Sequence, residues 1–223
     1  MKTESVPGID HALFDLDRTL IDCNSGRLWM VAEWRAGRIG VRDVAWASWW
    51  LGRYALGNDE GLDQVFATAV RTLEGSTEAE LADRVGHWFE TEVQHRLRPG
   101  ARAALDGHRQ AGHKLVLATS STQYVARCAI EAYALHDGVS TRLDVADGVF
   151  TGGIAELAVG DEKLHAVRRW ADAAGVELAR CAFYTDSMSD LALLEAVGEP
   201  VVVHPDRKLA QEAARRGWRV EKW

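Results

Sequence analysis

The ten residues His11–Leu20 constrain the fold of this chain more than any other stretch. An apolar run, Ala12–Phe14, is followed in alternation by two carboxylates and a hydroxyl, namely Asp15, Asp17 and Thr19. Successive side chains of a strand point to opposite faces, so an apolar strand that ends in Asp-x-Asp is leaving a protein core. Two carboxylates this close are costly to bury unless a cation or a proton compensates them. The stretch therefore predicts a strand end at which a carboxylate nucleophile could work beside a metal ion.

Later segments repeat this pattern of a short apolar run that reaches polar or turn-forming residues. Strands are expected over Lys114–Thr119, Arg180–Thr185 and Pro200–His204, and helices over Gln123–Ala134 and Leu191–Val197. Strands that alternate with helical stretches of about 10–15 residues indicate a parallel sheet with crossover helices. The expected fold is therefore α/β, with a doubly wound, Rossmann-like parallel sheet. Ligands of such sheets bind at the C-terminal ends of the strands, where the two early carboxylates fall.

Residues 23–98 have a different pattern from the rest of the chain. They look helical, without a convincing strand, and they hold six of the nine tryptophans: Trp29, Trp34, Trp46, Trp49, Trp50 and Trp88. We interpret this block as an inserted helical cap (residues 23–98) on a core domain of residues 1–22 and 99–223. Trp34, Trp46, Trp49 and Trp50 are expected mostly to pack between helices, because aromatic side chains bury large areas. The alternative is that some of them line an apolar substrate pocket.

Composition and charge exclude several classes of protein. The 223 residues are 47% hydrophobic and 26% charged, as in soluble globular proteins, and the net charge of −7 argues against a nucleic-acid-binding protein. Cys23, Cys128 and Cys181 are widely spaced, which fits reduced thiols better than a disulfide framework. We find neither an apolar leader nor a run of the roughly 18 apolar residues that a membrane span needs. A cytoplasmic protein without nucleic-acid partners or stable membrane insertion is expected.

A second acid pair and a lysine occur far along the chain. Asp186 and Asp190 follow the strand expected over Arg180–Thr185, and their spacing places both on one face of a helical turn. Aspartates are also common in ordinary turns, and a lone lysine such as Lys163 is most often a solvated helix residue. Two acid pairs at strand ends, together with Lys163 and the hydroxyl of Thr119, are typical of a catalytic constellation.

In these residues the chain resembles the haloacid dehalogenase (HAD) superfamily, specifically subfamily IB, its phosphoserine-phosphatase-like branch. Four motifs occur in order and cover most of the chain outside the cap interior. They are Phe14–Leu20, Leu117–Ser121, Lys163 and Tyr184–Asp190. The resemblance implies a Rossmann-like core with a helical cap of the C1 type. It also implies a Mg²⁺-dependent phosphatase.

The resemblance further implies a role for each carboxylate. Asp15 would attack phosphorus and become an aspartyl phosphate, which divides hydrolysis into two easier displacements. Asp17 would act as general acid and then as general base, and its backbone carbonyl would bind the metal. The carboxylates of Asp15 and Asp186 would also hold Mg²⁺, which prefers hard oxygen ligands. Asp190 would orient this metal site from just outside it.

Two other motifs would hold the phosphoryl group. Thr119 would hydrogen-bond to it, assisted by backbone N–H groups at the turn and helix start near Ser120. Lys163 would neutralise charge on Asp15 and on the phosphoryl oxygens. Two like charges about 4 Å apart repel by about 4 kcal/mol at an effective dielectric constant of roughly 20. Several carboxylates that face a phosphate dianion therefore need both the lysine and the metal, and we expect almost no turnover without metal.

Some further residues are alternative candidates for contacts with the substrate or the metal. Arg18 stands where the family motif usually has a small or polar residue, and it could face either the substrate or the solvent. Ser187 and Ser189 are expected to form and cap a turn, and the alternative for Ser189 is to hold a metal-bound water. Arg53 in the cap, like Arg27 and Arg35, could pair with a carboxylate or second phosphate of the substrate, and a solvated helix face is the alternative.

Asp17 favours phosphoryl transfer, because dehalogenases attack carbon and by family resemblance lack this second acid. The expected substrate is a small phosphorylated metabolite: phosphoserine-like, histidinol-phosphate-like or a lipid-derived phosphomonoester. Phosphoserine phosphatases carry a glutamate shortly after the DxDxT motif, whereas Ile21–Gly26 contains none. Asp22 could take its place, but the difference argues against phosphoserine itself. The alternatives are a phosphotransferase that uses the same aspartyl phosphate and a non-catalytic binding module on this fold. A monomer or a homodimer is expected.

Overall fold

The structure is a computed structural model that describes residues 8–40, 70 and 73–223. Its strands are β1 (His11–Phe14), β2 (Lys114–Thr122), β3 (Asp137–Ala146), β4 (Val149–Glu156), β5 (Cys181–Thr185), β6 (Glu199–Val203) and β7 (Arg219–Glu221). Its α-helices are α1 (Ser25–Arg35), α4 (Glu78–Trp88), α5 (Pro99–Gln110), α6 (Gln123–Ala132), α7 (Asp161–Ala174), α8 (Leu191–Ala196) and α9 (Arg207–Arg216). Short helical turns are η1 (Phe89–Val93), η2 (Gln94–Arg96), η3 (Leu178–Arg180) and η4 (Met188–Asp190).

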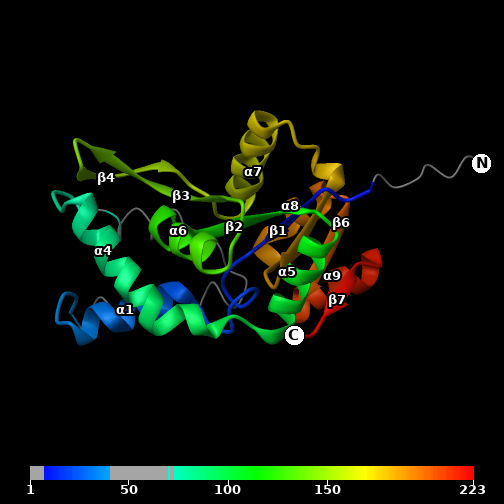
Figure 1. Ribbon diagram of the computed structural model, residues 1–223, viewed down its shortest axis with the longest axis horizontal. Coiled ribbons are helices and arrows are strands. Elements are labelled where there is room, and N and C mark those ends of the chain that lie inside the picture. Colours follow the sequence, from blue (N-terminus) through cyan, green and yellow to red (C-terminus); the bar gives the residue numbers. More distant parts are fainter. Residues whose placement is uncertain (1–7, 41–69, 71–72) are drawn as a thin grey trace, which may run out of the picture.

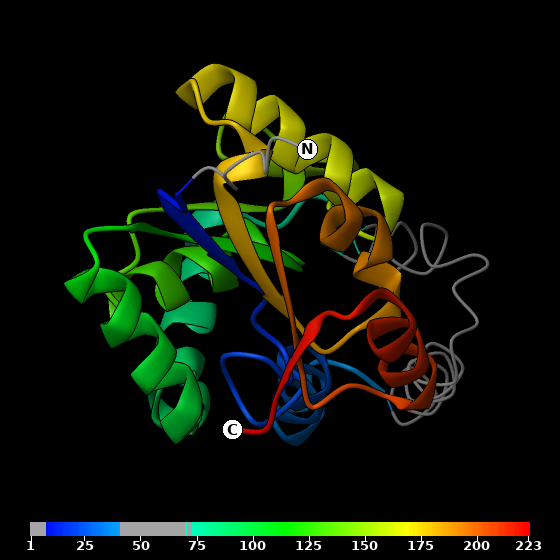
Figure 2. The same ribbon diagram turned by 90° about the vertical axis from the view of Figure 1, so that its right-hand side faces the viewer.

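The strands form one sheet in the order β4-β3-β2-β1-β5-β6-β7 (Figure 1). Neighbouring strands run parallel, except that β3 and β4 form an antiparallel pair at one edge. Helices cover both faces of the sheet (Figure 2). The predicted α/β class with a doubly wound parallel core is confirmed.

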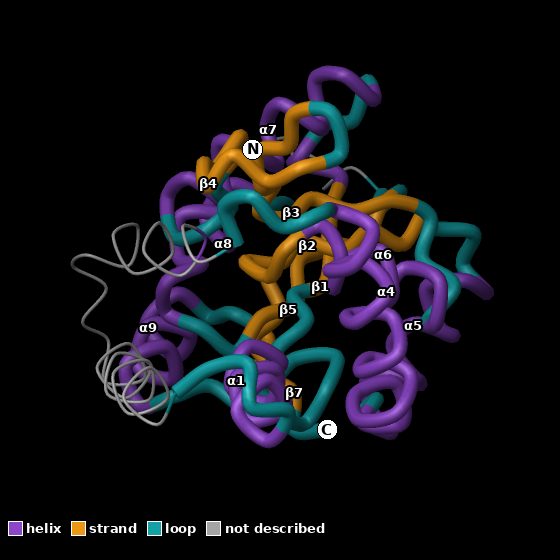
Figure 3. Tube along the Cα trace, turned by 90° about the vertical axis from the view of Figure 1, so that its left-hand side faces the viewer, coloured by secondary structure: helices purple, strands orange, loops and turns teal. Residues whose placement is uncertain are grey.

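Alternation along the central strands builds one hydrophobic layer on each face of the sheet. Ala12 and Phe14 of β1 join one cluster, whereas Leu13 joins the other, because successive strand residues point to opposite faces. The first cluster includes side chains of α4, α5 and α6, and the second includes those of α7, α8 and α9. Figure 3 shows α4, α5 and α6 on one side of the strands and α8 and α9 on the other. Burial on both faces explains why these strands are apolar throughout.

The β3–β4 hairpin and strand β7 were not predicted from the sequence. Asp147 and Gly148 form the two-residue connection of the hairpin, with φ of 52° and 77°. An Asp-Gly pair suits such a turn, because both positions need positive φ angles. Strand β2 continues to Thr122, so the turn expected near Ser120 is wrong, whereas α6 begins at Gln123, as predicted.

Between β1 and β2 the described chain is helical, as expected for the cap. Trp88 is buried in the same cluster as Phe14 of the sheet, whereas Trp34 is 46% exposed. The packing expected for Trp34 is therefore wrong, because its position near the end of α1 leaves it at the surface. Trp46, Trp49 and Trp50 lie outside the described residues, and the division into core and cap domains stays a prediction.

Glu33 connects two helices of this segment. Its carboxylate is buried and forms ion pairs with Arg38 and with Arg84 of α4, at 2.8 and 3.1 Å. Two cations compensate this one buried carboxylate, and the pair with Arg84 connects α1 to α4. None of the helices in residues 8–40, 70 and 73–223 is both long enough and apolar enough to span a membrane.

Candidate active site

Three neighbouring strands bring the predicted site residues to one edge of the sheet. Strand β1 pairs with both β2 and β5, with Phe14 opposite Leu117 and Tyr184. The residues just beyond this row therefore lie close together, and the N–H of Asp15 donates to the carbonyl of Tyr184 over 2.9 Å. Segments that are distant in the sequence thus meet at the C-terminal ends of the strands.

Lys163 joins two of the predicted carboxylates. It lies in the first turn of α7, and its Nζ is 3.1 Å from Asp15 Oδ1 and 2.8 Å from Asp190 Oδ1. All three side chains are buried. Thr185 fixes the other side of this group, because its Oγ1 donates to Asp190 Oδ2 over 2.7 Å. Lys163 is therefore a buried cation shared by two acids, and not a solvated helix residue.

Asp186 follows β5 and begins the loop that leads to η4. Its N–H donates to Thr19 Oγ1 over 3.0 Å, so the threonine of the first motif fixes the backbone of the fourth. Within the loop, the side chain of Ser187 accepts from the N–H of Ser189, and the two hydroxyls are 2.8 Å apart. Ser187 therefore caps η4, as predicted for one of these two serines, and Ser189 lies in the turn.

The Asp17 carboxylate contacts two serines that are not among the predicted site residues. Ser25 donates to it twice, from its N–H to Oδ1 over 2.6 Å and from its hydroxyl to Oδ2 over 3.1 Å. The hydroxyl of Ser121 lies 3.5 Å from the same Oδ2. Ser121 also links Asp17 to the predicted phosphoryl-binding residue, because its N–H donates to the buried Thr119 Oγ1 over 3.2 Å. A sequence signal existed for Ser25, because it begins the helix that follows the first motif, and the free N–H groups at the start of a helix bind carboxylates.

The site holds more negative than positive charge. Burial raises the pKa of Asp15 well above its usual range, and the Lys163 ammonium only partly offsets this. Burial, together with the charge of Asp190, raises the pKa of Asp186 to about 7. Burial also raises the pKa of Asp17, against its hydrogen bonds. Raised pKa values of this kind mean that one lysine does not compensate the whole group of acids.

A hard divalent cation fits this charge imbalance. The predicted ligands are two carboxylates, from Asp15 and Asp186, and one backbone carbonyl, from Asp17. Mg²⁺ commonly uses one or two protein carboxylates and keeps several waters. In the part of the chain that the structure describes, no three His, Cys, Asp or Glu side chains are arranged to hold a metal.

Three further residues were predicted to contact the substrate: Arg18, Ser120 and Arg53. Arg18 is exposed, with a φ of 60°, and its charge lowers the pKa of Asp186, which places it near the site. The carbonyl of Ser120 accepts a hydrogen bond from Thr141 Oγ1 over 2.9 Å, which anchors β2 to β3 beside Thr119. Arg53 lies outside the described residues.

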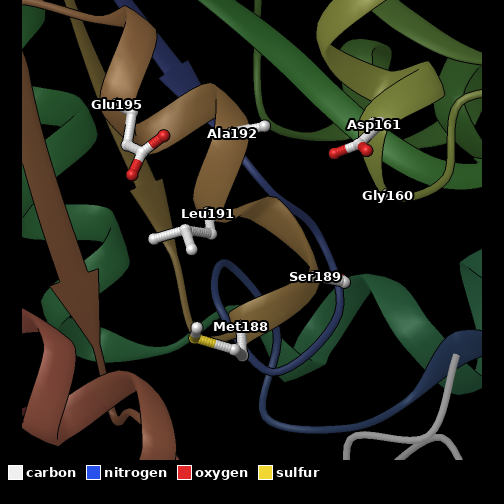
Figure 4. A pocket seen from close by; sticks show the side chains of 7 residues that line it. All are labelled: Gly160, Asp161, Met188, Ser189, Leu191, Ala192 and Glu195. Carbon is white, nitrogen blue, oxygen red and sulfur yellow. The ribbon is translucent and has the colours of Figure 1, made fainter.

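A pocket of about 370 Å³ adjoins the site between the start of α7 and the η4–α8 segment (Figure 4). Its lining residues are Gly160, Asp161, Met188, Ser189, Leu191, Ala192 and Glu195. A wider pocket, of about 630 Å³, lies between α1 and α4, and Trp29 and Trp88 are among the residues that line it.

Comparison with known proteins shows the family of this chain. The model of the haloacid dehalogenase-like hydrolases matches residues 12–195. A protein of Streptomyces azureus named for inhibition of morphological differentiation is 30% identical over 210 residues, 93% of this chain and 76% of that protein. A phosphoserine phosphatase of Mycobacterium tuberculosis is 29% identical over 94% of this chain and 69% of its own length. A histidinol-phosphatase of Neisseria meningitidis is 26% identical, over 94% of this chain and 96% of its own length.

Solved structures have the same fold. The crystal structure of a protein of unknown function from Bordetella pertussis has a TM-score of 0.83 and 29% identity, with 96% of this chain and 98% of that chain covered. A phosphoserine phosphatase that carries an analogue of a phospho-aspartyl intermediate has a TM-score of 0.65 at 17% identity, with 92% and 91% covered. The resemblance inferred from the four motifs is confirmed, and with it the prediction of a phosphatase of this superfamily. The chain belongs to the haloacid dehalogenase-like hydrolases.

Proposed function

We propose that this chain is a Mg²⁺-dependent phosphomonoester hydrolase that works through an aspartyl phosphate on Asp15. The observation that supports this best is the buried contact of Asp15 with Lys163, 3.1 Å away, at an edge where Asp17, Thr119 and Asp186 also lie. A buried carboxylate that is held by one cation and surrounded by further acids lowers the stability of the fold. Such arrangements are typical of functional sites. Its position at the end of a central parallel strand is where such sheets bind their ligands.

The proposed reaction has two displacements. Asp15 attacks phosphorus, an O–P bond forms to its carboxylate, the bond to the leaving oxygen breaks, and Asp17 gives its proton to that oxygen. A water then attacks the same phosphorus, Asp17 takes the proton from the water, and the bond to Asp15 breaks with release of phosphate. Lys163 stabilises the negative charge at Asp15 and at the phosphoryl oxygens throughout both displacements.

The other residues bind and orient the phosphoryl group. Thr119 donates a hydrogen bond to it, and the bond between Asp186 and Thr19 keeps the fourth motif beside the first. When bound by the carboxylates of Asp15 and Asp186 and the carbonyl of Asp17, Mg²⁺ would supply charge stabilisation to the phosphoryl oxygens. Asp190 keeps Lys163 in place from the opposite side, with 2.8 Å between Nζ and Oδ1.

The proposed substrate is a small phosphorylated metabolite with an alkoxide leaving group. Relatives named phosphoserine phosphatase and histidinol-phosphatase support this class, since both names describe phosphate esters of an alcohol. An alkoxide needs a proton in order to leave, and Asp17 provides one. The absence of a glutamate in Ile21–Gly26 favours a substrate other than phosphoserine.

Phosphate release from a panel of phosphorylated metabolites, with and without Mg²⁺, tests this proposal. The wild-type chain is expected to hydrolyse at least one of them, and Asp15→Asn is expected to lower turnover by at least about 10³-fold, the scale on which nucleophile loss acts in other hydrolases. Asp172→Asn, a matched change on the exposed side of α7, should leave turnover unchanged. Unchanged turnover in Asp15→Asn would exclude Asp15 as the nucleophile.

Two other outcomes would replace the proposal. Formation of a new phosphate ester when an acceptor alcohol is added, in place of inorganic phosphate, would show a phosphotransferase. Absence of hydrolysis across the panel in the Mg²⁺-loaded, folded protein would favour a non-catalytic binding module.

A further inference from the structure

Ser25 and Ser121 approach one carboxylate oxygen from distant parts of the chain. Ser25 opens α1, whereas Ser121 lies near the end of β2. Their hydroxyls are 3.1 and 3.5 Å from Asp17 Oδ2, and they are 3.1 Å from each other. The three polar groups therefore form one cluster, in which Asp17 lies between the start of a helix and the end of a sheet strand.

From this geometry we infer that Ser25 and Ser121 are positioning residues that hold the Asp17 carboxylate in the orientation needed for proton transfer. This inference rests on the proposed function, in which Asp17 is the general acid and base. An aspartate side chain has two rotatable bonds, so its carboxylate needs partners on more than one side to keep one orientation. The Ser25 N–H at 2.6 Å fixes Oδ1, and the two hydroxyls fix Oδ2.

Within residues 8–40, 70 and 73–223, the hydroxyl of Ser25 contacts Asp17 and Ser121 and takes no part in capping its helix. The start of α1 is already capped by Asn24, whose side chain accepts from the N–H of Arg27 over 2.8 Å. Ser25 itself is only 1% exposed, so its hydroxyl depends on protein partners rather than on water. Those partners are Asp17 and Ser121, which indicates that this buried hydroxyl serves the carboxylate and not the helix.

Hydroxyl groups suit this task better than a cation would. A serine hydroxyl both donates and accepts hydrogen bonds, whereas a lysine ammonium only donates. The contacts of Ser25 and Ser121 can therefore persist whether Asp17 carries the proton or has given it to the leaving group. Ser121 also ties this cluster to the phosphoryl-binding residue, through its N–H bond to Thr119 Oγ1.

A series of para-substituted phenyl phosphates tests the inference, because the basicity of the leaving group changes along it while each variant is compared with wild type on the same ester. A weakly basic leaving group such as para-nitrophenolate departs without a proton, whereas phenolate and para-methoxyphenolate benefit from a general acid. Misplacing Asp17 should therefore lower kcat/KM mainly for the more basic leaving groups. The parameter kcat/KM is suitable because it reports the steps up to and including the first displacement, in which the bond to the leaving group breaks.

Ser25→Ala and Ser121→Ala are each expected to lower kcat/KM by about 10-fold for para-methoxyphenyl phosphate, within the roughly 10²–10⁴-fold that general acid catalysis contributes. The value for para-nitrophenyl phosphate should change little. Ser121→Thr keeps a hydroxyl on a strand position and should retain the wild-type profile. Ser140→Ala removes a buried hydroxyl on β3 and serves as the matched control, with no change along the series.

An equal loss of kcat/KM for every leaving group, or no loss in either alanine variant, would overturn the inference. Thermal unfolding of each variant checks that the chain remains folded, and Ser121→Ala provides the test if Ser25→Ala does not fold. If the wild-type chain with Mg²⁺ hydrolyses none of these esters and no metabolite of the panel, the proposed function fails first. The two failures are therefore distinguishable.

Discussion

Lys163 and Asp190 form a nearly water-free ion pair: Lys163 Nζ lies 2.8 Å from Asp190 Oδ1, and the two side chains are 2% and 1% exposed. Lys163 belongs to α7 and Asp190 to η4, so the pair ties together two segments of the proposed active site. A second acid, Asp15, shares the same ammonium at 3.1 Å. Burial of charged groups is expensive, and the arrangement depends on every partner being present.

Removal of the lysine should therefore destabilise the chain strongly. We expect Lys163→Met to lower the free energy of unfolding by about 3–5 kcal/mol, because it leaves buried carboxylates without a cation. The double variant Lys163→Met/Asp190→Asn should recover part of this loss, since one of the two uncompensated charges is then absent. Urea denaturation in metal-free buffer measures both effects. A stability of Lys163→Met equal to wild type would show that the pair contributes nothing.

Removal of the metal should abolish phosphate release, and added Mg²⁺ should restore it. Asp186→Asn is expected to raise the Mg²⁺ dissociation constant by at least about 10-fold, as loss of a supporting group in metal sites already does. Calorimetric titration with Mg²⁺ measures this without substrate, and bound Mg²⁺ should also raise the unfolding temperature. Asp172→Asn is the matched control, with unchanged affinity. Equal Mg²⁺ affinity in Asp186→Asn and wild type would remove Asp186 from the metal site.

The histidine on α5 should make stability depend on pH. Burial, with smaller contributions from the charges of His113 and Arg219, lowers the pKa of His108 to about 4 from its usual 6.5. Its Nε2 lies 2.8 Å from the hydroxyl of Tyr184. Because the unfolded chain takes up this proton at higher pH than the folded chain, the contribution of His108 is present above pH 6.5 and decreases as the pH falls towards 4.

Urea denaturation between pH 7 and pH 5 checks this dependence. His108→Gln should lose less stability than wild type over that range, because the titrating group is gone. His165→Gln, at an exposed position on α7, should follow wild type. Identical pH dependence of His108→Gln and wild type would contradict the expected contribution.

Two glycines should respond in opposite ways to the same substitution. A Cβ on Gly198 would lie 2.0 Å from the carbonyl oxygen of Ala179, whereas a Cβ on Gly107 within α5 would meet nothing within 4 Å. Gly198→Ala should lower the free energy of unfolding by about 1–3 kcal/mol, since the backbone must shift. Gly107→Ala should raise it by about 0.5–1 kcal/mol, because alanine favours the helix. Thermal or urea unfolding distinguishes them, and a loss in Gly107→Ala would contradict this account.

Much of the fold and of the site could be predicted, because the informative signals are local. Apolar runs that end in Asp15 and Asp186 mark strand ends, and the ends of parallel strands share one edge of a sheet. The β3–β4 hairpin was missed although Asp147 and Gly148 carry its turn signal, because its strands lack the continuous apolar run of the buried strands. Trp34 was expected to pack between helices, but the presence of a tryptophan does not determine which face of α1 packs against another helix.

The amino-acid sequence by itself determined the α/β class, the strand ends and the acids and lysine of the four motifs, since residue type and spacing encode them directly. Only the tertiary structure decided that Lys163 also faces Asp190, and that Ser25 and Ser121 meet at Asp17. Ser25 and Ser121 are 96 positions apart in the sequence. Partners at such a separation are selected by the packing of β1, β2 and α1, which a local pattern does not contain.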